Sequence, residues 1–124
     1  MAKVLLYNLT PSKAAQLKML CRRIFVEATE VDRSDFGKPI ASLLDGSAAS
    51  LPAQPADFDG EMLYFAEMDG GMLKILLDQI KRKKLGVALK AVQTETNTAF
   101  TSQQLYCELC AEREAISKSI YANN

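Results

Sequence analysis

The sequence predicts an α/β fold: a small three-layer sandwich of two β-α-β units, with a four-stranded, mainly parallel sheet in the order 2-1-3-4 and a C-terminal helix. Two observations carry this prediction. Short apolar runs alternate with stretches of helical periodicity, in a strand–helix–strand plan that occurs twice along the chain. The runs at residues 4–7 and 62–65 are also continuously apolar, as strands buried on both faces are.

Length and composition indicate one globular domain, residues 1–124, with 48% hydrophobic and 24% charged residues. The formal net charge of zero leaves no excess of positive charge to hold nucleic acid. No apolar run approaches the roughly 20 residues that span a bilayer, and the apolar start is too short for a signal peptide. Three cysteines, an odd number, are typical of reduced thiols. We therefore expect a cytoplasmic protein without nucleic-acid or membrane partners.

The first unit begins with the strand at residues 4–7. Thr10 suits a helix N-cap and Pro11 the first helical position, so a helix is expected to start there. A second strand is expected around residues 26–31. Apolar side chains recur between them at helical spacing, at Ala14, Leu17, Leu20, Cys21, Ile24 and Phe25.

The second unit repeats this plan. A strand at residues 62–66 leads into the turn at Asp69 and Gly70, and a closing strand is expected at 87–92. Gly86 is expected to end the intervening helix after a basic last turn. The helix has an apolar stripe formed by Met72, Leu73, Leu76, Leu77 and Ile80.

The remaining segments connect and close these units. Residues 38–44 predict a short helix with Pro39 near its start, and residues 46–60, rich in Ser, Ala, Pro and Asp, predict a mobile loop. Residues 101–122 predict a helix with Phe100 at its start. The candidate buried positions of that helix are Leu105, Leu109, Cys110, Ile116 and Ile120.

Two topologies fit this order of elements. A ferredoxin-like α+β fold with an antiparallel sheet leaves one sheet face open to solvent, so its central strands alternate apolar and polar residues. We favour the parallel sheet because the first and third strands are continuously apolar, while Glu27, Glu30 and Lys90 suit edge strands. The short Pro39 helix can then cross to the sheet face opposite the helices of the two units, and the C-terminal helix can return to cover the first face.

Four motifs resemble those of a bacterial family of uncharacterised proteins, domain of unknown function 3783. They are Val4-Leu5-Leu6-Tyr7-Asn8, Met62-Leu63-Tyr64-Phe65, the segment from Leu89 to Asn97, and the helical run from Leu105 to Glu112. The resemblance covers nearly the whole chain outside residues 46–60. Phe100 stands where the family often has Trp. The resemblance implies no activity.

In a parallel sheet, Asn8 and Glu67 would follow adjacent strands and lie side by side where the strand order reverses. Polar residues around them would converge on one crevice for a polar or anionic small molecule. The expected ligand-binding residues are Asn8, Thr10, Glu67, Asp69, Gly70, Thr94 and Asn97. We favour a second interpretation, in which Thr10, Asp69, Thr94 and Asn97 only cap helices and fix turns.

The sequence predicts no catalytic residues, metal site or cofactor, since histidine is absent and no nucleophile–base pair is visible. Cys107 and Cys110 have C-x-x-C spacing but lie inside the last helix, which favours a structural role.

The leading functional prediction is a non-catalytic binding or protein-interaction module that uses an edge strand to bind a protein partner or a second copy. The alternative is a sensor-like domain that binds a small polar or anionic ligand in the crevice. A second alternative is a thiol-dependent enzyme centred on Cys107 and Cys110.

Overall fold

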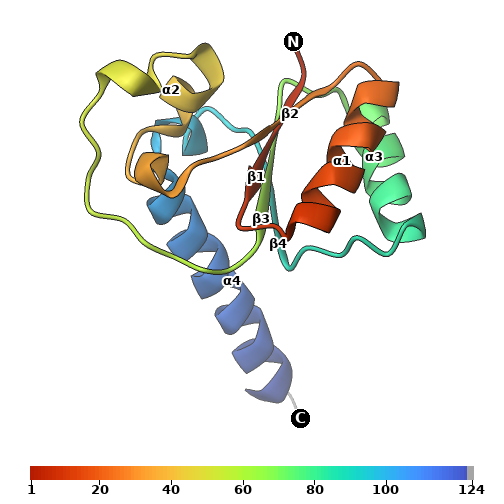
Figure 1. Ribbon diagram of the computed structural model, residues 1–124. Helices are drawn as coiled ribbons and strands as arrows, with labels where there is room; N and C mark the ends of the chain where they lie inside the picture. Colours follow the sequence, from red (N-terminus) through yellow and green to blue (C-terminus); the bar gives the residue numbers. More distant parts are fainter. Residues whose placement is uncertain (123–124) are drawn as a thin grey trace.

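The strand–helix–strand plan occurs twice in the computed structural model, which describes residues 1–122 and the side chains of residues 1–116 (Figure 1). The first unit is β1 (Lys3–Tyr7), α1 (Pro11–Arg23) and β2 (Glu27–Glu30). The second unit is β3 (Met62–Ala66), α3 (Gly70–Arg82) and β4 (Leu89–Val92). The short helix α2 (Ile40–Asp45) lies between the units, and α4 (Ser102–Ala122) follows them.

The sheet has the predicted strand order, β2-β1-β3-β4. The strands within each unit are parallel neighbours, so the ferredoxin-like alternative with its antiparallel sheet is wrong. The central pair, β1 and β3, runs antiparallel, with Lys3 opposite Ala66 and Tyr7 opposite Met62. The sheet is therefore mixed. The physical reason is that the connection from β2 to β3 starts and finishes at the same end of the strands, instead of crossing the length of the sheet to the other end.

Helices cover both faces of the sheet, as the three-layer prediction requires. Helices α1 and α3 lie on one face, and α2 lies with α4 on the other (Figure 1). The expectation that the C-terminal helix returns to the first face is wrong. Leu105 and Phe100 instead pack with Phe36 and Ile40 of the α2 layer, so α4 shares the second sheet face with α2.

The central strands are buried on both sides, which explains their continuous apolar sequence. In β1, Val4 and Leu6 face α1 and α3, while Leu5 and Tyr7 face α2 and α4. Every residue of β3 is buried as well. Burial of this apolar surface is the main stabilising contribution to the fold.

Helices α1 and α3 start where the sequence predicts. The Thr10 hydroxyl accepts a hydrogen bond from the backbone N–H of Lys13, and the Asp69 carboxylate accepts one from Met72. The end of α3 departs from the prediction: the helix ends at Arg82, and Lys84, not Gly86, takes the left-handed backbone conformation at φ 55°.

Left-handed residues recur at matched positions of the two units. Asn8 and Glu67 follow the first strand of each unit, and Phe25 and Lys84 follow each helix. The members of both pairs are 59 residues apart, as are the N-caps. The two units therefore share their turns as well as their order of elements.

The loop at residues 46–60 is anchored at its end. Phe58 is buried and stacks on Phe36, with ring centroids 4.4 Å apart. Arg33 forms ion pairs with Asp57 and Asp59, each at 2.6 Å. These contacts fix the approach to β3, and mobility in the rest of the loop stays a prediction.

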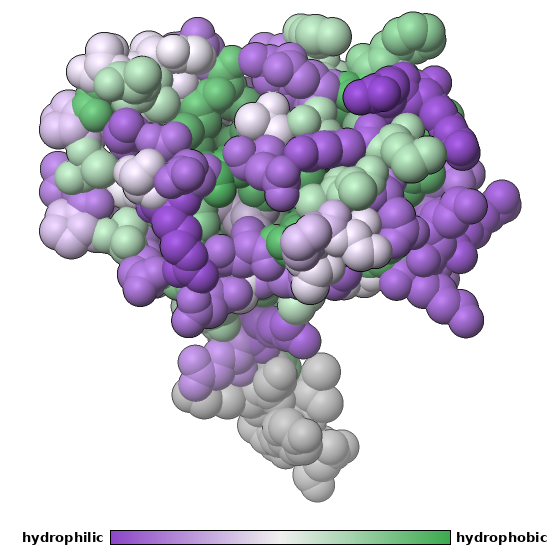
Figure 2. All heavy atoms as spheres, in the orientation of Figure 1, coloured by the Kyte–Doolittle hydropathy of each residue, from purple (hydrophilic) through white to green (hydrophobic). Residues whose placement is uncertain are grey.

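Helix α4 leaves the body of the domain in its second half (Figure 1). Its start is tied down by a buried hydrogen bond of 2.7 Å between the hydroxyls of Ser102 and Tyr7. Ile116, expected to be buried, is 61% exposed because the helix has by then passed the sheet. Ile120 lies outside the described side chains. The face drawn in Figure 2 is mainly hydrophilic over the outer side of the α1–α3 layer. Within residues 1–122, no helix is both long and apolar enough to cross a membrane.

Candidate functional site

The predicted ligand residues do not form one crevice. Because β1 and β3 are antiparallel, Asn8 and Glu67 lie at opposite ends of the sheet along the strand direction. Asn8 and Thr10 are at one end. The other end carries Glu67, Asp69, Gly70, Thr94 and Asn97, because β4 runs parallel to β3. The prediction of convergence is therefore wrong, although each residue occupies a defined turn.

At the first of these ends, Asn8 holds the loop that enters β3. Its side-chain amide donates hydrogen bonds to the backbone oxygens of Phe58 at 2.8 Å and Gly60 at 3.1 Å. Its left-handed φ of 59° suits asparagine better than most other residues. Thr10 at the same end of the sheet caps α1. Both side chains thus have structural partners.

At the opposite end of the sheet, the side chains of Glu67 and Asp69 also have partners within the chain. The Glu67 carboxylate lies 2.8 Å from the amino group of Met1, and this hydrogen bond lowers the pKa of the carboxyl. Asp69 caps α3. No other part of the chain lies within 4 Å of where a Gly70 β-carbon would be, so no close backbone approach requires glycine at this position.

The turn from Thr94 to Asn97 is closed by its own hydrogen bonds. The Asn97 side-chain oxygen accepts from the Tyr64 hydroxyl at 2.6 Å and from the backbone N–H of Thr94 at 2.9 Å. Its amide donates to the backbone oxygen of Val92 at 3.0 Å. Asn97 therefore joins β3, β4 and the turn.

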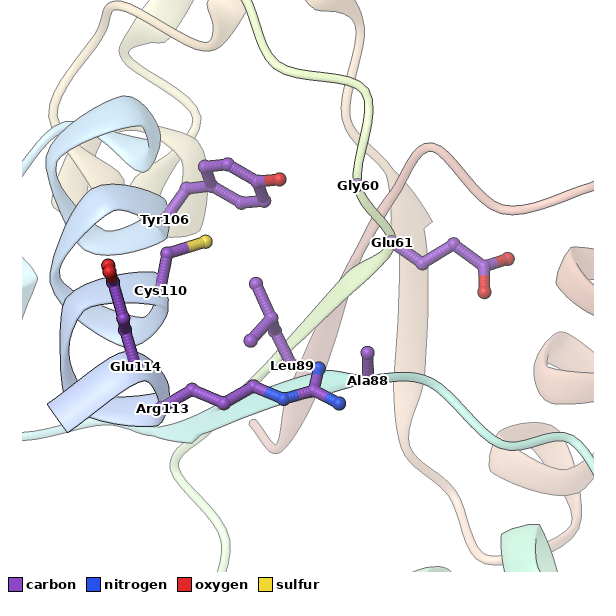
Figure 3. A pocket seen from close by; sticks show the side chains of 8 residues that line it. All are labelled: Gly60, Glu61, Ala88, Leu89, Tyr106, Cys110, Arg113 and Glu114. Atoms are coloured by element: carbon purple, nitrogen blue, oxygen red, sulfur yellow. The ribbon is translucent and has the colours of Figure 1, made fainter. Parts of the chain in front are cut away.

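A pocket of about 360 Å³ lies elsewhere, between α4, the start of β4 and the residues that precede β3 (Figure 3). Tyr106, Cys110 and Arg113 reach into it from α4. Sequence reasoning pointed to none of these as ligand residues, and to Cys110 only as one thiol of the C-x-x-C pair, because only the packing of α4 against β4 brings them together. The lining residues are Gly60, Glu61, Ala88, Leu89, Tyr106, Cys110, Arg113 and Glu114.

One wall of the pocket is built by Tyr106. Its ring stacks on Phe58 with centroids 4.2 Å apart, and Phe58 in turn stacks on Phe36. Burial raises the pKa of the Tyr106 phenol, and a hydrogen bond with the Cys110 thiol raises it further. The wall is thus fixed by stacking, and the phenol on it is neutral near pH 7.

The charges in the pocket are unequally engaged. Glu61 forms an ion pair with Lys13 at 2.7 Å. Arg113 extends toward Ala88 and Leu89 (Figure 3) and forms no ion pair among the described residues. The guanidinium can therefore accept an anionic partner from outside the chain.

A second hollow of about 360 Å³ continues along the outer side of β4 and α4. Its lining forms what we call the β4–α4 surface. The lining residues are Ala88, Leu89, Lys90, Leu109, Glu112, Arg113 and Ile116. On the other face of the sheet, a third hollow of about 410 Å³ is lined by Leu77, Ile80, Lys81, Gly86 and Lys90. The edge of β4 is therefore flanked by hollows on both faces.

The outer edge of β4 has unpaired backbone groups. The N–H of Gln93 bonds to the backbone oxygen of Phe65, so by strand alternation Lys90 and Val92 direct their N–H and C=O groups outward. The sheet ends at β4 in the described part of the chain. Such an edge can pair with another strand.

The thiols and acidic groups supply no separate site. Cys107 is exposed and lies beyond the first turn of α4, away from the helix N-terminus where reactive cysteines are found. Among the described residues, no group of three or more Cys, Asp or Glu side chains is arranged to hold a metal ion.

Searches of curated proteins and of solved structures gave no match. The resemblance found in the sequence is confirmed over the second unit and most of α4, a segment that contains the whole β4–α4 surface. Residues 61–116 match the model of the family described as Domain of unknown function (DUF3783).

Proposed function

We propose that this domain is a protein-interaction module that binds an extended polypeptide along the edge of β4, with the neighbouring surface of α4 completing the contact. The observation that carries the proposal is the combination of outward backbone groups at Lys90 and Val92 with hollows on both faces of the same strand. An added strand would satisfy the backbone groups, and its alternate side chains would enter the two hollows.

The character of the edge supports this role. Natural edge strands avoid pairing by presenting charges, but the Lys90 ammonium turns back to the backbone oxygen of Val87 at 2.8 Å. Val92 is 47% exposed next to it. The opposite edge, β2, presents the exposed carboxylate of Glu27 and the exposed ion pair of Glu30 with Lys18. β4 is thus the less protected edge.

The test is a screen of displayed extended peptides against the whole chain, followed by Val92→Pro. Proline removes one outward N–H without removing a hydrogen bond to β3, so peptide affinity should fall about tenfold or more. Val92→Thr, which keeps the N–H, and Glu30→Pro, which makes the matched change on β2, should leave the affinity unchanged. Peptides that bind equally well to Val92→Pro would overturn the proposal.

A second candidate function rests on Arg113. Its guanidinium faces a pocket large enough for a small organic anion, and it has no ion-pair partner among the described residues. We propose that a carboxylate or phosphate ligand would bind there. Thermal unfolding with acetate, phosphate and nucleotides should show a rise in Tm that Arg113→Gln abolishes and Val92→Pro retains. No rise with any of these anions would overturn it.

We also propose a cytoplasmic location. Its support is that all three cysteines, Cys21, Cys107 and Cys110, are free thiols. Fractionation of cells that express the chain would test this, and recovery outside the cytoplasm would contradict it.

A further inference from the structure

Positive charge gathers at the end of α3 and the start of β4, although the net charge of the chain is zero. The interval between Asp78 and Glu95 has no acidic residue. Its cations are Lys81, Arg82, Lys83, Lys84 and Lys90. Among the described residues, none of these cations forms an ion pair. The region beside β4 therefore has a local positive field that the domain does not neutralise.

Two of these cations line the hollow on the α3 side of β4, which we call the α3–β4 hollow. Its volume is about 410 Å³, and its lining residues are Leu77, Ile80, Lys81, Gly86 and Lys90. Ile80 is buried and Leu77 is partly buried, whereas Lys81 and Lys90 are exposed. The hollow thus has an apolar inner wall and a positively charged rim.

The α3–β4 hollow lies where a docked strand would direct a side chain. Lys90 pairs with Leu63 of β3, whose side chain faces α1 and α3, so the Lys90 side chain lies on that face too. Paired residues of neighbouring strands have their side chains on the same sheet face, whichever way the strands run. The residue of a docked strand beside Lys90 therefore directs its side chain toward the α3–β4 hollow. Its two neighbours direct theirs toward the β4–α4 surface.

The β4–α4 surface suits a different kind of side chain. Leu109 and Ile116 give it an apolar part, and Ile116 is 61% exposed. Apart from Lys90, which borders both hollows, its charged residues are Glu112 and Arg113, of opposite sign. A carboxylate therefore gains less on this face than in the α3–β4 hollow, whereas an apolar side chain can pack on Leu109 and Ile116.

We propose that the polypeptide that binds along β4 is acidic, with a glutamate in the α3–β4 hollow and apolar residues on either side of it. The acidic partner presupposes the proposed docking role of β4 and gives that partner its chemistry. The methylene groups of the glutamate pack on Leu77 and Ile80. Its carboxylate accepts hydrogen bonds from the ammonium groups of Lys81 and Lys90. Lys90 keeps its bond to the Val87 backbone oxygen, because an ammonium group has three donors.

Fluorescence anisotropy with three labelled peptides tests this preference. The peptides alternate Val with Glu, Val with Gln, or Val with Lys between identical Gly-Ser ends, so they differ only at every second residue. The Glu–Val peptide should bind about tenfold tighter than the Gln–Val peptide, and the Lys–Val peptide should bind weakest. The advantage of Glu over Gln should shrink at about 1 M salt, because salt screens the attraction. Val92→Pro should weaken binding of the Glu–Val peptide about tenfold or more.

The variant Lys81→Gln tests where the carboxylate lies. It should weaken binding of the Glu–Val peptide about fivefold and leave the Gln–Val peptide unchanged. The matched control is Arg82→Gln, which removes the same charge from the next residue, outside the hollow. This control should weaken binding less than about twofold, through the long-range field alone. Far-ultraviolet circular dichroism should show unchanged helix content, since Lys81 and Arg82 are both exposed.

The results that would overturn the acidic partner differ from those that would overturn strand docking. Equal affinity for the Glu–Val and Gln–Val peptides, with both sensitive to Val92→Pro, would overturn the acidic partner and leave the docking role of β4 standing. Glu–Val binding that is insensitive to Val92→Pro would overturn both. Equal losses from Lys81→Gln and Arg82→Gln would overturn the placement of the carboxylate in the hollow. A duplex oligonucleotide that binds tighter than the Glu–Val peptide would overturn an acidic polypeptide as the partner.

Discussion

Gly60 and Tyr106 are in such close contact that no side chain fits between them. A β-carbon on Gly60 would lie 2.5 Å from the phenol oxygen of Tyr106 and 2.8 Å from a ring carbon. We predict that Gly60→Ala forces the ring off Phe58 and lowers the free energy of unfolding by about 1–3 kcal/mol. Urea denaturation would measure the change.

A double-mutant cycle identifies the cause of that loss. In a Tyr106→Ala background, Gly60→Ala should cost less than half as much, because the clashing ring is absent. Gly70→Ala is the control, since nothing lies within 4 Å of the added methyl group. An equal loss with and without Tyr106 would contradict the proposed contact.

Asn97 is predicted to stabilise the fold, with no direct part in ligand binding. Its side chain makes three hydrogen bonds, to Tyr64, Thr94 and Val92. Asn97→Ala should lower the free energy of unfolding by about 2–3 kcal/mol, because it leaves these partners unsatisfied. Thermal or urea unfolding checks the value. Full retention of stability would show that water replaces these hydrogen bonds.

Phe25 is predicted to be a strained residue whose replacement stabilises the domain. Its φ is 59° and its side chain is 85% exposed, so it has an unfavourable backbone conformation with little burial to offset it. Phe25→Gly should raise the free energy of unfolding by about 0.5–1 kcal/mol. Lys84→Gly, at the matched position of the second unit, should act alike. Destabilisation at position 25 would indicate apolar contacts of the ring that outweigh the strain.

Stability should fall in mildly alkaline solution because of Cys21. Burial in the core raises the pKa of this thiol from 9.0 to about 11, so the folded state binds the proton more tightly than the unfolded state does. The stabilisation is complete below about pH 9 and is lost as pH rises toward 11. Between about pH 8 and pH 10 the loss should reach roughly 1 kcal/mol.

The variant Cys21→Ala separates this effect from other titrations. It should be less stable than the native chain at neutral pH by about 1–2 kcal/mol, because it leaves a small cavity. The difference between the two proteins should shrink between pH 8 and pH 10. A constant difference over that range would contradict the assigned titration.

Local sequence patterns predicted much of the fold because local physics determines it. The N-caps at Thr10 and Asp69 and the apolar runs of β1 and β3 are properties of short segments. The direction of β3 relative to β1 is not such a property. Both strands are buried on two faces whichever way they run, so the same apolar sequences suit a parallel and an antiparallel arrangement equally well.

The error about the crevice followed from that direction. If β3 ran parallel to β1, Asn8 and Glu67 would be neighbours, but the antiparallel pairing separates them. The pocket near Tyr106 and Arg113 depends on where α4 packs, which no local pattern encodes. A signal did exist in the apolar stripe that runs on to Ile116, past the length that the domain can bury.

The central claim, that β4 is a docking edge for an extended polypeptide, is tested most directly by amide hydrogen exchange with and without an extended peptide selected by the screen. Lys90 and Val92 direct their N–H groups outward from β4, and Ala28 and Glu30 do so from β2, because Glu27 and Val31 bond inward to β1. Exchange at Lys90 and Val92 should slow when the peptide is bound, while exchange at Ala28 and Glu30 stays constant. Rates at Lys90 and Val92 that the peptide does not change, or slowing at Ala28 and Glu30 instead, would contradict the account.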